Sequence, residues 1–168
     1  DIYLRQQGFT VMMADAANHA KVDLVHHGRS SEVQTLRFHA YEMNFLGSNP
    51  QAQTDGEKPQ VHYYNYFLGN NPDHWKSNIH PVFGVNYTSL YTGIDAHIYS
   101  ENAQIKYDLI VHPGGKPEDI RIQYVGTDGL RIDHNQLLIK TSLGDVNELK
   151  PFCYQFLQGE RVEVACRY

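Results

Sequence analysis

The chain has 168 residues, a formal net charge of −5 and 41% hydrophobic residues, including 12 tyrosines and 7 phenylalanines. This length suits one domain with a sizeable core, and tyrosine rings suit half-buried strand faces. The acidic balance, without a cluster of Lys or Arg, argues against nucleic-acid binding. No apolar run approaches the roughly 20 residues of a membrane-spanning helix, so we expect a chain that does not span a membrane.

Alternating apolar and polar residues, bounded by Gly, Asn, Asp and Pro, predict short strands from the N-terminus onward. The opening segment shows no cleavable signal, and both a mature product and an excised domain fit it. The apolar phase changes near Tyr41-Glu42, which indicates a β-bulge. Residues 47–60 contain two prolines and no aliphatic residue larger than alanine, so they predict a loop. The strands expected before this loop cover residues 2–6, 9–15, 21–27 and 33–47.

The segment NYFLGNNPDHWKSNIHP, residues 65–81, contains the only tryptophan of the chain. Asn71 is predicted to cap a single helical turn that begins at Pro72. Such a turn would bring Trp75 back over a sheet and into the core. The alternative interpretation leaves the rings on the surface, as a stacking platform for a sugar or a peptide. The ligand-binding residues of that alternative are Trp75, Tyr64, Tyr66, Asn70 and Asn71.

The second half of the chain continues the strand pattern. A hairpin is expected across Asn102-Ala103, and a brief helical turn at residues 117–119. About a dozen strands at a spacing of roughly 8–12 residues indicate an all-β fold, an antiparallel β-sandwich-like domain. We expect residues 1–168 to form one such domain with at most one or two helical turns. The later strands are expected within 82–91, 94–101, 104–112, 120–126, 129–133, 136–141, 144–149 and the terminal hairpin.

The two cysteines of the chain, Cys153 and Cys166, flank the segment CYQFLQGERVEVAC. If Gly159-Glu160 forms a two-residue turn, Cys153 faces Cys166 across an antiparallel pair, within disulfide reach. A turn centred on Gln158-Gly159 would offset the two cysteines diagonally, and two buried free thiols are the other alternative. A disulfide would indicate an oxidising, extracytoplasmic location.

Ten histidines raise the question of a metal site. Asp95 and His97 lie on one face of a predicted strand, with Tyr99 continuing it, whereas the adjacent His26 and His27 point to opposite faces. Two ligands do not make a site, and neither an HExxH motif nor a Cys/His cluster occurs. We therefore expect no metal and no cofactor.

Motifs of nucleophilic catalysis are absent from the sequence as well. There is no G-x-S-x-G segment, and neither cysteine lies beside a histidine. No Asp or Glu stands out from the turn-forming background, although paired carboxylates of a hydrolase are recognised only in space. We expect no catalytic residues, with a hydrolase as the least favoured alternative.

Three motifs in the middle of the chain carry a resemblance to a known family. They are N-Y-F-x-G-N-x-P-x-x-W from Asn65, Y-x-x-x-Y-x-G-I-D from Tyr87, and Y-D-x-x-V-x-P-G from Tyr107. With the later GLRID and LLIKTSLGDVNELKPFCYQ, they resemble an uncharacterised domain near the N-terminus of large secreted bacterial proteins. Those proteins often carry propeller-like SBBP repeats, PKD-type modules or a type IX secretion sorting domain related to gliding-motility surface proteins. The pair Cys153 and Cys166 departs from the family pattern.

The residues within these motifs are predicted to serve the architecture. Gly93 and Gly114-Gly115 suggest backbone positions that need unusual dihedral angles. Tyr87, Tyr91 and Tyr107 are expected to be half-buried rings whose hydroxyls find partners. Asp95 and Asp108 are expected to accept hydrogen bonds from loop amides.

What the resemblance implies is a location, extracellular or at the cell surface, rather than an activity. We expect a non-catalytic structural or interaction module of an exported bacterial multidomain protein. Its partners would be neighbouring domains of the same chain or a surface protein. The alternative is a carbohydrate-binding module that holds a polysaccharide with exposed aromatic rings.

Overall fold

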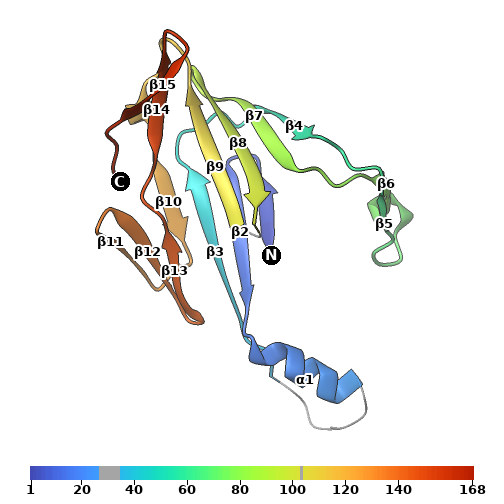
Figure 1. Cartoon of the computed structure of the whole chain (residues 1–168). Coiled ribbons are helices and arrows are strands. Elements are labelled where there is room, and N and C mark those ends of the chain that lie inside the picture. Colours follow the sequence, from blue (N-terminus) through green and yellow to red (C-terminus); the bar gives the residue numbers. More distant parts are fainter. Residues whose placement is uncertain (27–34, 103) are drawn as a thin grey trace. The chain divides into compact units, whose positions relative to one another are not determined.

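The computed structural model describes residues 1–26, 35–102 and 104–168 (Figure 1). Within these residues it contains 15 strands in several antiparallel sheets, one α-helix and two short 3₁₀ turns, so the all-β class is confirmed. The elements are β1 (Ile2–Arg5), β2 (Gly8–Ala14), α1 (Ala17–His26), β3 (Phe38–Phe45), β4 (Gln53–Glu57), β5 (Tyr64–Tyr66), η1 (Pro72–His74), β6 (Lys76–Ile79), β7 (Gly84–Tyr91), β8 (Ile94–Glu101), β9 (Gln104–Val111), η2 (Pro117–Asp119), β10 (Ile122–Val125), β11 (Gly129–Asp133), β12 (Gln136–Thr141), β13 (Gly144–Glu148), β14 (Cys153–Leu157) and β15 (Glu160–Val164).

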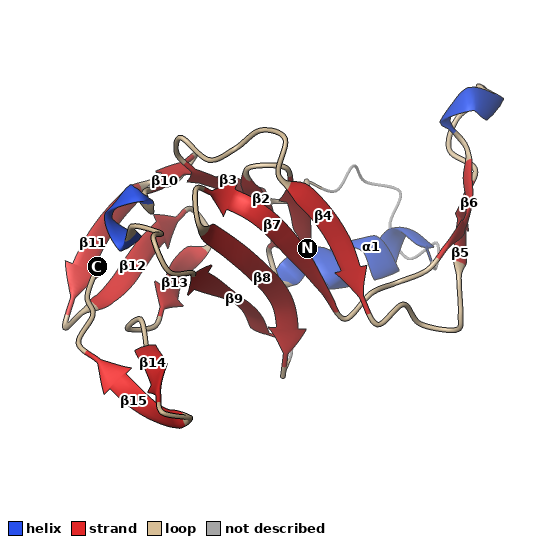
Figure 2. Cartoon of the chain, turned by 90° about the horizontal axis from the view of Figure 1, so that it is seen from above, coloured by secondary structure: helices blue, strands red, loops and turns tan. Residues whose placement is uncertain are grey.

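The strands form sheets of unequal size, drawn in red in Figure 2. Two sheets have four strands each, in the orders β1-β2-β3-β10 and β4-β7-β8-β9. A third has the order β11-β12-β13, while β5-β6 and β14-β15 are two-stranded. Most neighbours are consecutive in the chain, because short turns join antiparallel strands directly.

Contacts divide the chain into two compact units. Unit 1 comprises residues 1–4, 9–44 and 123–168, and unit 2 comprises residues 5–8 and 45–122. The expectation of a single domain over residues 1–168 stays a prediction.

The core of unit 2 lies on one face of its four-stranded sheet. Ile94, Ala96 and Ile98 alternate along β8 and are buried, and Leu90 on β7 is fully buried. Tyr87 is also buried, and its hydroxyl donates a hydrogen bond to the carbonyl of Arg5 at 2.9 Å. The period of two thus places one apolar face inside and leaves the polar side chains of the same strands outside.

Two buried tyrosines confirm the expectation that their hydroxyls find partners. Besides Tyr87, Tyr91 donates to the carbonyl of Arg121 at 3.3 Å. Burial raises the pKa of both phenols. Each ring therefore fills the core while its hydroxyl satisfies a main-chain oxygen.

The core of unit 1 joins the four-stranded sheet to the β11-β12-β13 sheet. Tyr41 of β3 clusters with Leu137 and Ile139 of β12, all buried. The Tyr41 and Tyr124 rings lie 6.4 Å apart. Partly buried side chains complete the cluster, namely Val11, Met13, Tyr124 and Val146.

The strand predicted at residues 21–27 is wrong, because this segment belongs to helix α1. Asp15 starts the helix: its carboxylate accepts the N–H of Ala17 at 2.9 Å and its carbonyl that of Asn18. The buried Asn18 side chain in turn pairs with both the N–H and the carbonyl of Arg37. Local side-chain hydrogen bonds thus override the alternation of apolar residues. His26 ends the helix, while His27 lies outside the described residues.

Two further predictions fail between residues 36 and 60. The alternation of burial is regular from Phe38 to Phe45, with Tyr41 and Met43 inside, and lacks the phase change that a bulge at Tyr41-Glu42 would produce. The predicted loop contains strand β4, which pairs with β7 from Gln53↔Thr88 to Glu57↔Gly84. An edge strand needs backbone groups rather than large apolar side chains, so its composition resembles that of a loop.

Candidate functional site

The segment that contains Trp75 folds as a hairpin of its own. Strands β5 and β6 pair through Tyr64↔Ile79 and Tyr66↔Lys76, with an irregularity between the two tyrosines. The side chain of Asn65 accepts the N–H of Asn78, whose φ of +59° is left-handed. Asparagine tolerates this conformation better than most residues, which explains the irregular register.

The turn at the tip of the hairpin confirms the predicted cap. The side chain of Asn71 accepts the N–H of Asp73 at 3.1 Å, and Pro72 begins the single 3₁₀ turn. Trp75 closes the turn by donating its backbone N–H to the carbonyl of Pro72. Proline at this position costs no hydrogen bond, because the first N–H of a helical turn has no internal partner.

The prediction that Trp75 enters the core is wrong. Its side chain lies on the surface and is 40% exposed. The indole N–H donates to the carbonyl of Gly69 at 3.2 Å, and the ring meets Phe67 edge to face at 5.5 Å. Both partners belong to the same hairpin, so the ring is held locally.

Tyr64 and Tyr66 share one face of β5, as the alternation predicts. Their ring centroids lie 6.4 Å apart at an interplanar angle of 41°, and both rings are about half exposed. His62 packs edge to face on Tyr64. The rings are tilted rather than coplanar, so they form an uneven surface instead of a flat platform.

The hairpin brings the five candidate ligand-binding residues into one segment but divides their roles. Tyr64 and Tyr66 form one ring pair, whereas Trp75 packs on Phe67. Asn70 is exposed at the tip, and the Asn71 side chain is already engaged in the cap. Further apolar side chains of the hairpin are exposed. Val61, Tyr63 and Phe67 belong to the run VHYYNYF, whose rings the alternative interpretation places on the surface, whereas Leu68 and Ile79 lie outside that run.

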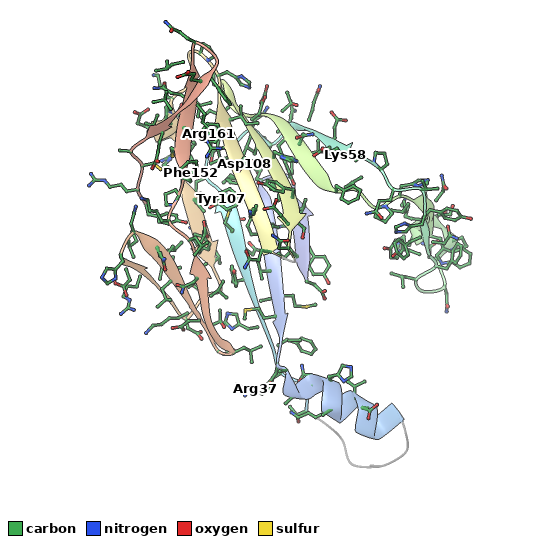
Figure 3. All side chains as sticks on the ribbon, viewed as in Figure 1. Arg37, Lys58, Tyr107, Asp108, Phe152 and Arg161 are labelled. Atoms are coloured by element: carbon green, nitrogen blue, oxygen red, sulfur yellow. The ribbon has the colours of Figure 1, made fainter. Side chains whose placement is uncertain are left out.

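The C-terminal hairpin of unit 1 is a second exposed aromatic element (Figure 3). The guanidinium of Arg161 lies 4.9 Å from the ring centre of Phe152 and 4.5 Å from that of Tyr154, a cation–π arrangement. Phe156 meets the Tyr154 ring edge to face at 5.7 Å and is 67% exposed. Rings on this hairpin are therefore ordered by one another and by Arg161.

The turn of this hairpin differs from the one that would set the cysteines face to face. Leu157 pairs with Glu160, so the turn is Gln158-Gly159, and both turn residues have positive φ. Cys153 consequently faces Val164, and Cys166 lies beyond the end of β15. The diagonal offset, the alternative reading of the sequence, is the correct one, and both cysteines are free thiols in the structure.

Ionisable groups gather on the outer face of β8 in unit 2. The Asp95 carboxylate accepts the backbone N–H of Ser89 at 2.7 Å and lies 2.7 Å from Nε2 of His112. These hydrogen bonds, that of Ser89 first, hold the pKa of Asp95 below its ordinary value. Ser89 lies in the irregular part of strand β7 with φ of +57°, so Asp95 supports a strained backbone amide, as predicted, but one within a strand and not in a loop.

A second carboxylate–histidine pair lies one position along the same face. His97 Nε2 is 2.9 Å from a carboxylate oxygen of Glu57, and Tyr99 stacks on the imidazole at 4.7 Å. The pKa of Glu57 is lowered, chiefly by its hydrogen bond with Lys58. Asp95 and His97 therefore share a face as predicted, but each has its own partner.

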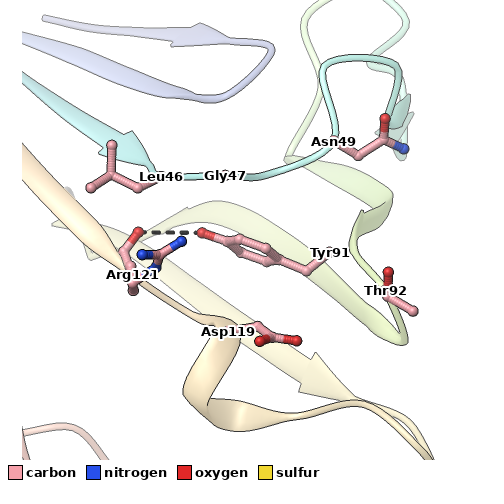
Figure 4. A pocket seen from close by; sticks show the side chains of 7 residues that line it. All are labelled: Leu46, Gly47, Asn49, Tyr91, Thr92, Asp119 and Arg121. Atoms are coloured by element: carbon pink, nitrogen blue, oxygen red, sulfur yellow. Dashed lines mark hydrogen bonds between the residues drawn. The ribbon is translucent and has the colours of Figure 1, made fainter.

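A small polar pocket of about 220 Å³ lies in unit 2 (Figure 4). The Tyr91 hydroxyl donates to the Arg121 carbonyl across it, and the Arg121 side chain runs along Gly47. Because this hydroxyl donates to the main chain, its proton is not available to a ligand in the pocket. Its lining consists of Leu46, Gly47, Asn49, Tyr91, Thr92, Asp119 and Arg121.

Neither a metal centre nor a membrane helix is found in the part of the chain that the structure describes. No group of three or more His, Cys, Asp or Glu side chains there is arranged to hold a metal ion. No helix in residues 1–26, 35–102 and 104–168 has the length and apolar character required to cross a bilayer.

These observations define an all-β chain with two exposed aromatic hairpins among its described residues. The chain belongs to the family described as Domain of unknown function (DUF7948), which matches residues 1–168. No curated protein and no solved structure matches it.

Proposed function

We propose that this chain is a non-catalytic interaction module of an exported bacterial multidomain surface protein. Its β5–β6 hairpin contacts a neighbouring domain of the same protein. The surface location is supported by the resemblance of the three central motifs to domains of large secreted proteins. SBBP repeats or a type IX secretion sorting domain in the same gene product are part of the proposal.

The main support for an interaction module is the exposure of the β5–β6 hairpin. Every residue from 62 to 80 is exposed. Large apolar patches on a soluble domain mark sites of protein contact, because their hydration is unfavourable. The exposed fractions of the largest side chains are 56% for Tyr63, 51% for Tyr64, 47% for Tyr66, 61% for Phe67, 71% for Leu68 and 40% for Trp75.

The two-stranded form of the hairpin supports the same conclusion. A hairpin of two short strands is marginally stable on its own, because it lacks a sheet neighbour and a buried face. A neighbouring domain that covers the rings would supply the missing burial. The outer edges of β5 and β6 are also free for strand addition within the sheets described, since these strands pair only with each other.

Trp75 makes this proposal testable, because it is the only tryptophan in the chain. In the isolated chain we expect red-shifted emission that acrylamide quenches readily. A longer piece of the same gene product, with every tryptophan outside this chain replaced by phenylalanine, should show blue-shifted emission and protection from acrylamide. Emission that stays red-shifted and accessible there would contradict the proposal.

A matched variant separates the hairpin from general effects. The Tyr64→Ala/Tyr66→Ala double variant should restore quencher access to Trp75 in the longer protein. Tyr154→Ala, on the other hairpin, should leave Trp75 protected. If both variants behave alike, the β5–β6 hairpin is not the contact.

The second candidate is binding of a polysaccharide, favoured by the exposure of Trp75 beside Tyr64 and Tyr66. Aromatic rings stack on sugar faces, and Asn70 would add an amide. The tilted geometry of the rings suits a protein surface better. Titration of the isolated chain with soluble β-glucan, xylan and chitin oligosaccharides tests this candidate: a saturable change in Trp75 emission that Tyr64→Ala abolishes would favour it.

A further inference from the structure

The two cysteines lie on the same face of the C-terminal hairpin. Cys153 pairs with Val164, so continuing the register by two residues places Cys166 across from Pro151. Side chains alternate along a strand, and Cys153 and Cys166 therefore point to the same side. Diagonal neighbours of this kind lie farther apart than direct pairs but remain within reach of each other's side chains.

The side chains close this diagonal gap. The Cys166 thiol donates to the carbonyl of Pro151 at 3.2 Å, which turns it back over β14. The same thiol is also a hydrogen-bonding neighbour of the Cys153 thiol. Cys166 lies beyond Val164, the last residue of β15, so its backbone is not part of the strand pairing.

Burial singles out the same two residues. Between residues 152 and 168, Cys153 and Cys166 alone are partly buried, and every other residue is exposed. The hairpin thus shields its two thiols while presenting its aromatic rings to solvent.

The segment that carries Cys166 is held in place on both sides. The carbonyl of Cys166 accepts a hydrogen bond from the Asn135 amide, whose oxygen accepts the N–H of Tyr168. The Tyr168 hydroxyl lies 3.0 Å from a Glu148 carboxylate oxygen and 2.9 Å from the Leu149 carbonyl oxygen, and it shares its one proton between these two acceptors. These contacts already restrict the conformations of the Cys166 segment. Closing the loop with a disulfide therefore costs less conformational entropy.

We propose that Cys153 and Cys166 form an intrachain disulfide under oxidising conditions, and that this bond clamps the C-terminal segment to β14. The inference goes beyond the interaction function and does not depend on it. The oxidant is a small-molecule or protein disulfide, of the kind that oxidising compartments supply.

The reaction is a pair of thiol–disulfide exchanges. The Cys166 thiolate attacks one sulfur of the oxidant, forming a mixed disulfide and releasing one thiolate. The Cys153 sulfur then attacks Cys166 Sγ, releasing the second thiolate and losing its proton. Two cysteine thiols are oxidised and one external disulfide is reduced to two thiols. Burial and the neighbouring Cys166 raise the pKa of Cys153 to about 11, which disfavours the thiolate of Cys153.

The test uses the intact 168-residue chain and oxidised glutathione as the probe. After treatment and removal of glutathione, we expect a mass lower by two hydrogen atoms and no free thiol in the denatured protein. Tryptic cleavage after Arg161 separates the cysteines in sequence, so the two peptides should stay linked until a reductant is added. The thermal midpoint of the oxidised chain should exceed that of the reduced chain by about 5 °C.

Cys153→Ala and Cys166→Ala are the matched controls. Each should bind one glutathione or none, stay monomeric, and lose the difference between oxidised and reduced thermal midpoints. Three results would overturn the proposal: two free thiols after oxidation, a stable glutathione adduct on the unmodified sequence, or a disulfide between two chains. None of them depends on Trp75, so they leave the interaction proposal to its own test.

Discussion

Tyr87 shows how one hydroxyl contributes to the stability of unit 2. Its ring is 2% exposed and its hydroxyl donates to the Arg5 carbonyl. Tyr87→Phe keeps the ring but removes this hydrogen bond of 2.9 Å. We expect the free energy of unfolding in urea to fall by about 1–2 kcal/mol.

Tyr91 provides the control for that substitution. The Arg121 carbonyl that accepts the Tyr91 hydroxyl at 3.3 Å also accepts the N–H of Leu46 at 2.8 Å. Tyr91→Phe therefore leaves a carbonyl that keeps one good donor, and should cost less than about 1 kcal/mol. If both variants lose the same free energy of unfolding, the Tyr87 hydrogen bond contributes no more to stability than the Tyr91 hydrogen bond.

The Asp95 carboxylate links stability to acid pH. Its hydrogen bonds with Ser89 and His112 hold its pKa below the ordinary value of 3.8. The folded chain thus binds this proton less readily than the unfolded chain, so the stabilisation is complete above the unfolded pKa. It is lost as the pH falls below 3.8 and through the folded pKa.

Asp95→Asn should flatten the decline of unfolding free energy between about pH 4 and about pH 2, because the titrating group is gone. Urea unfolding at a series of pH values measures this slope. Asp55→Asn, at an exposed position of β4, is the control and should leave the slope closer to that of the unmodified chain. If Glu57→Gln flattens the slope of unfolding free energy against pH more than Asp95→Asn does, the pH dependence comes from the Glu57–His97 pair instead.

At the level of elements, two glycines join the β7–β8 turn to the segment after β9. A Cβ on Gly115 would lie 2.4 Å from the Gly93 carbonyl oxygen, and that oxygen already accepts the N–H of His112. Gly93 itself has φ of +71°, which favours glycine. The contact thus excludes a side chain at Gly115 even though its own φ is ordinary.

Gly115→Ala should therefore lower the free energy of unfolding by about 1–3 kcal/mol, since the two backbones must separate. Gly129→Ala places its new methyl 3.7 Å from the Lys140 side chain, an ordinary contact, and should change stability by less than about 0.5 kcal/mol. Thermal and urea unfolding measure both. A Gly115→Ala chain as stable as the Gly129→Ala chain would mean that the close approach relaxes freely.

Many strands could be predicted because the alternation of apolar and polar residues is a local feature of the sequence. Strands β7, β8 and β9 lie where this alternation places them. Helix α1 was not, because the contacts of Asn18 with Arg37 join residues far apart in the chain. Strand β4 was missed because its pairing uses backbone groups.

The candidate site shows the same division between local and tertiary information. The Asn71 cap follows from neighbouring residues and was predicted. Whether Trp75 is buried depends on which other part of the protein packs against the hairpin. The local sequence pattern carries no information about that packing. The Gly159-Glu160 turn failed for a local reason, since Gln158 adopts the left-handed conformation that asparagine and glycine usually take.

At the scale of the whole molecule, the course of the chain argues for cooperative unfolding. The division between the units falls within the β1-β2-β3-β10 sheet, after Leu4, after Gly8, after Asn44 and after Ile122. One end residue of each strand therefore belongs to unit 2, and the chain passes from one unit to the other four times within this sheet. We expect one transition in which both units unfold together.

Two core substitutions test this cooperativity, one in each unit. Leu90 in unit 2 is 0% exposed and Ile139 in unit 1 is 1% exposed, and either change to Ala should cost about 2–5 kcal/mol. In native-state hydrogen exchange, Leu90→Ala should lower the protection of the slowest amides of β12 as well as β8, because those amides exchange only through global opening. Ile139→Ala in unit 1 should likewise lower the protection of the slowest amides of β8 in unit 2. Loss of protection confined to the substituted unit would instead show that the units unfold independently, and that the shared strands separate at the points where the division crosses them.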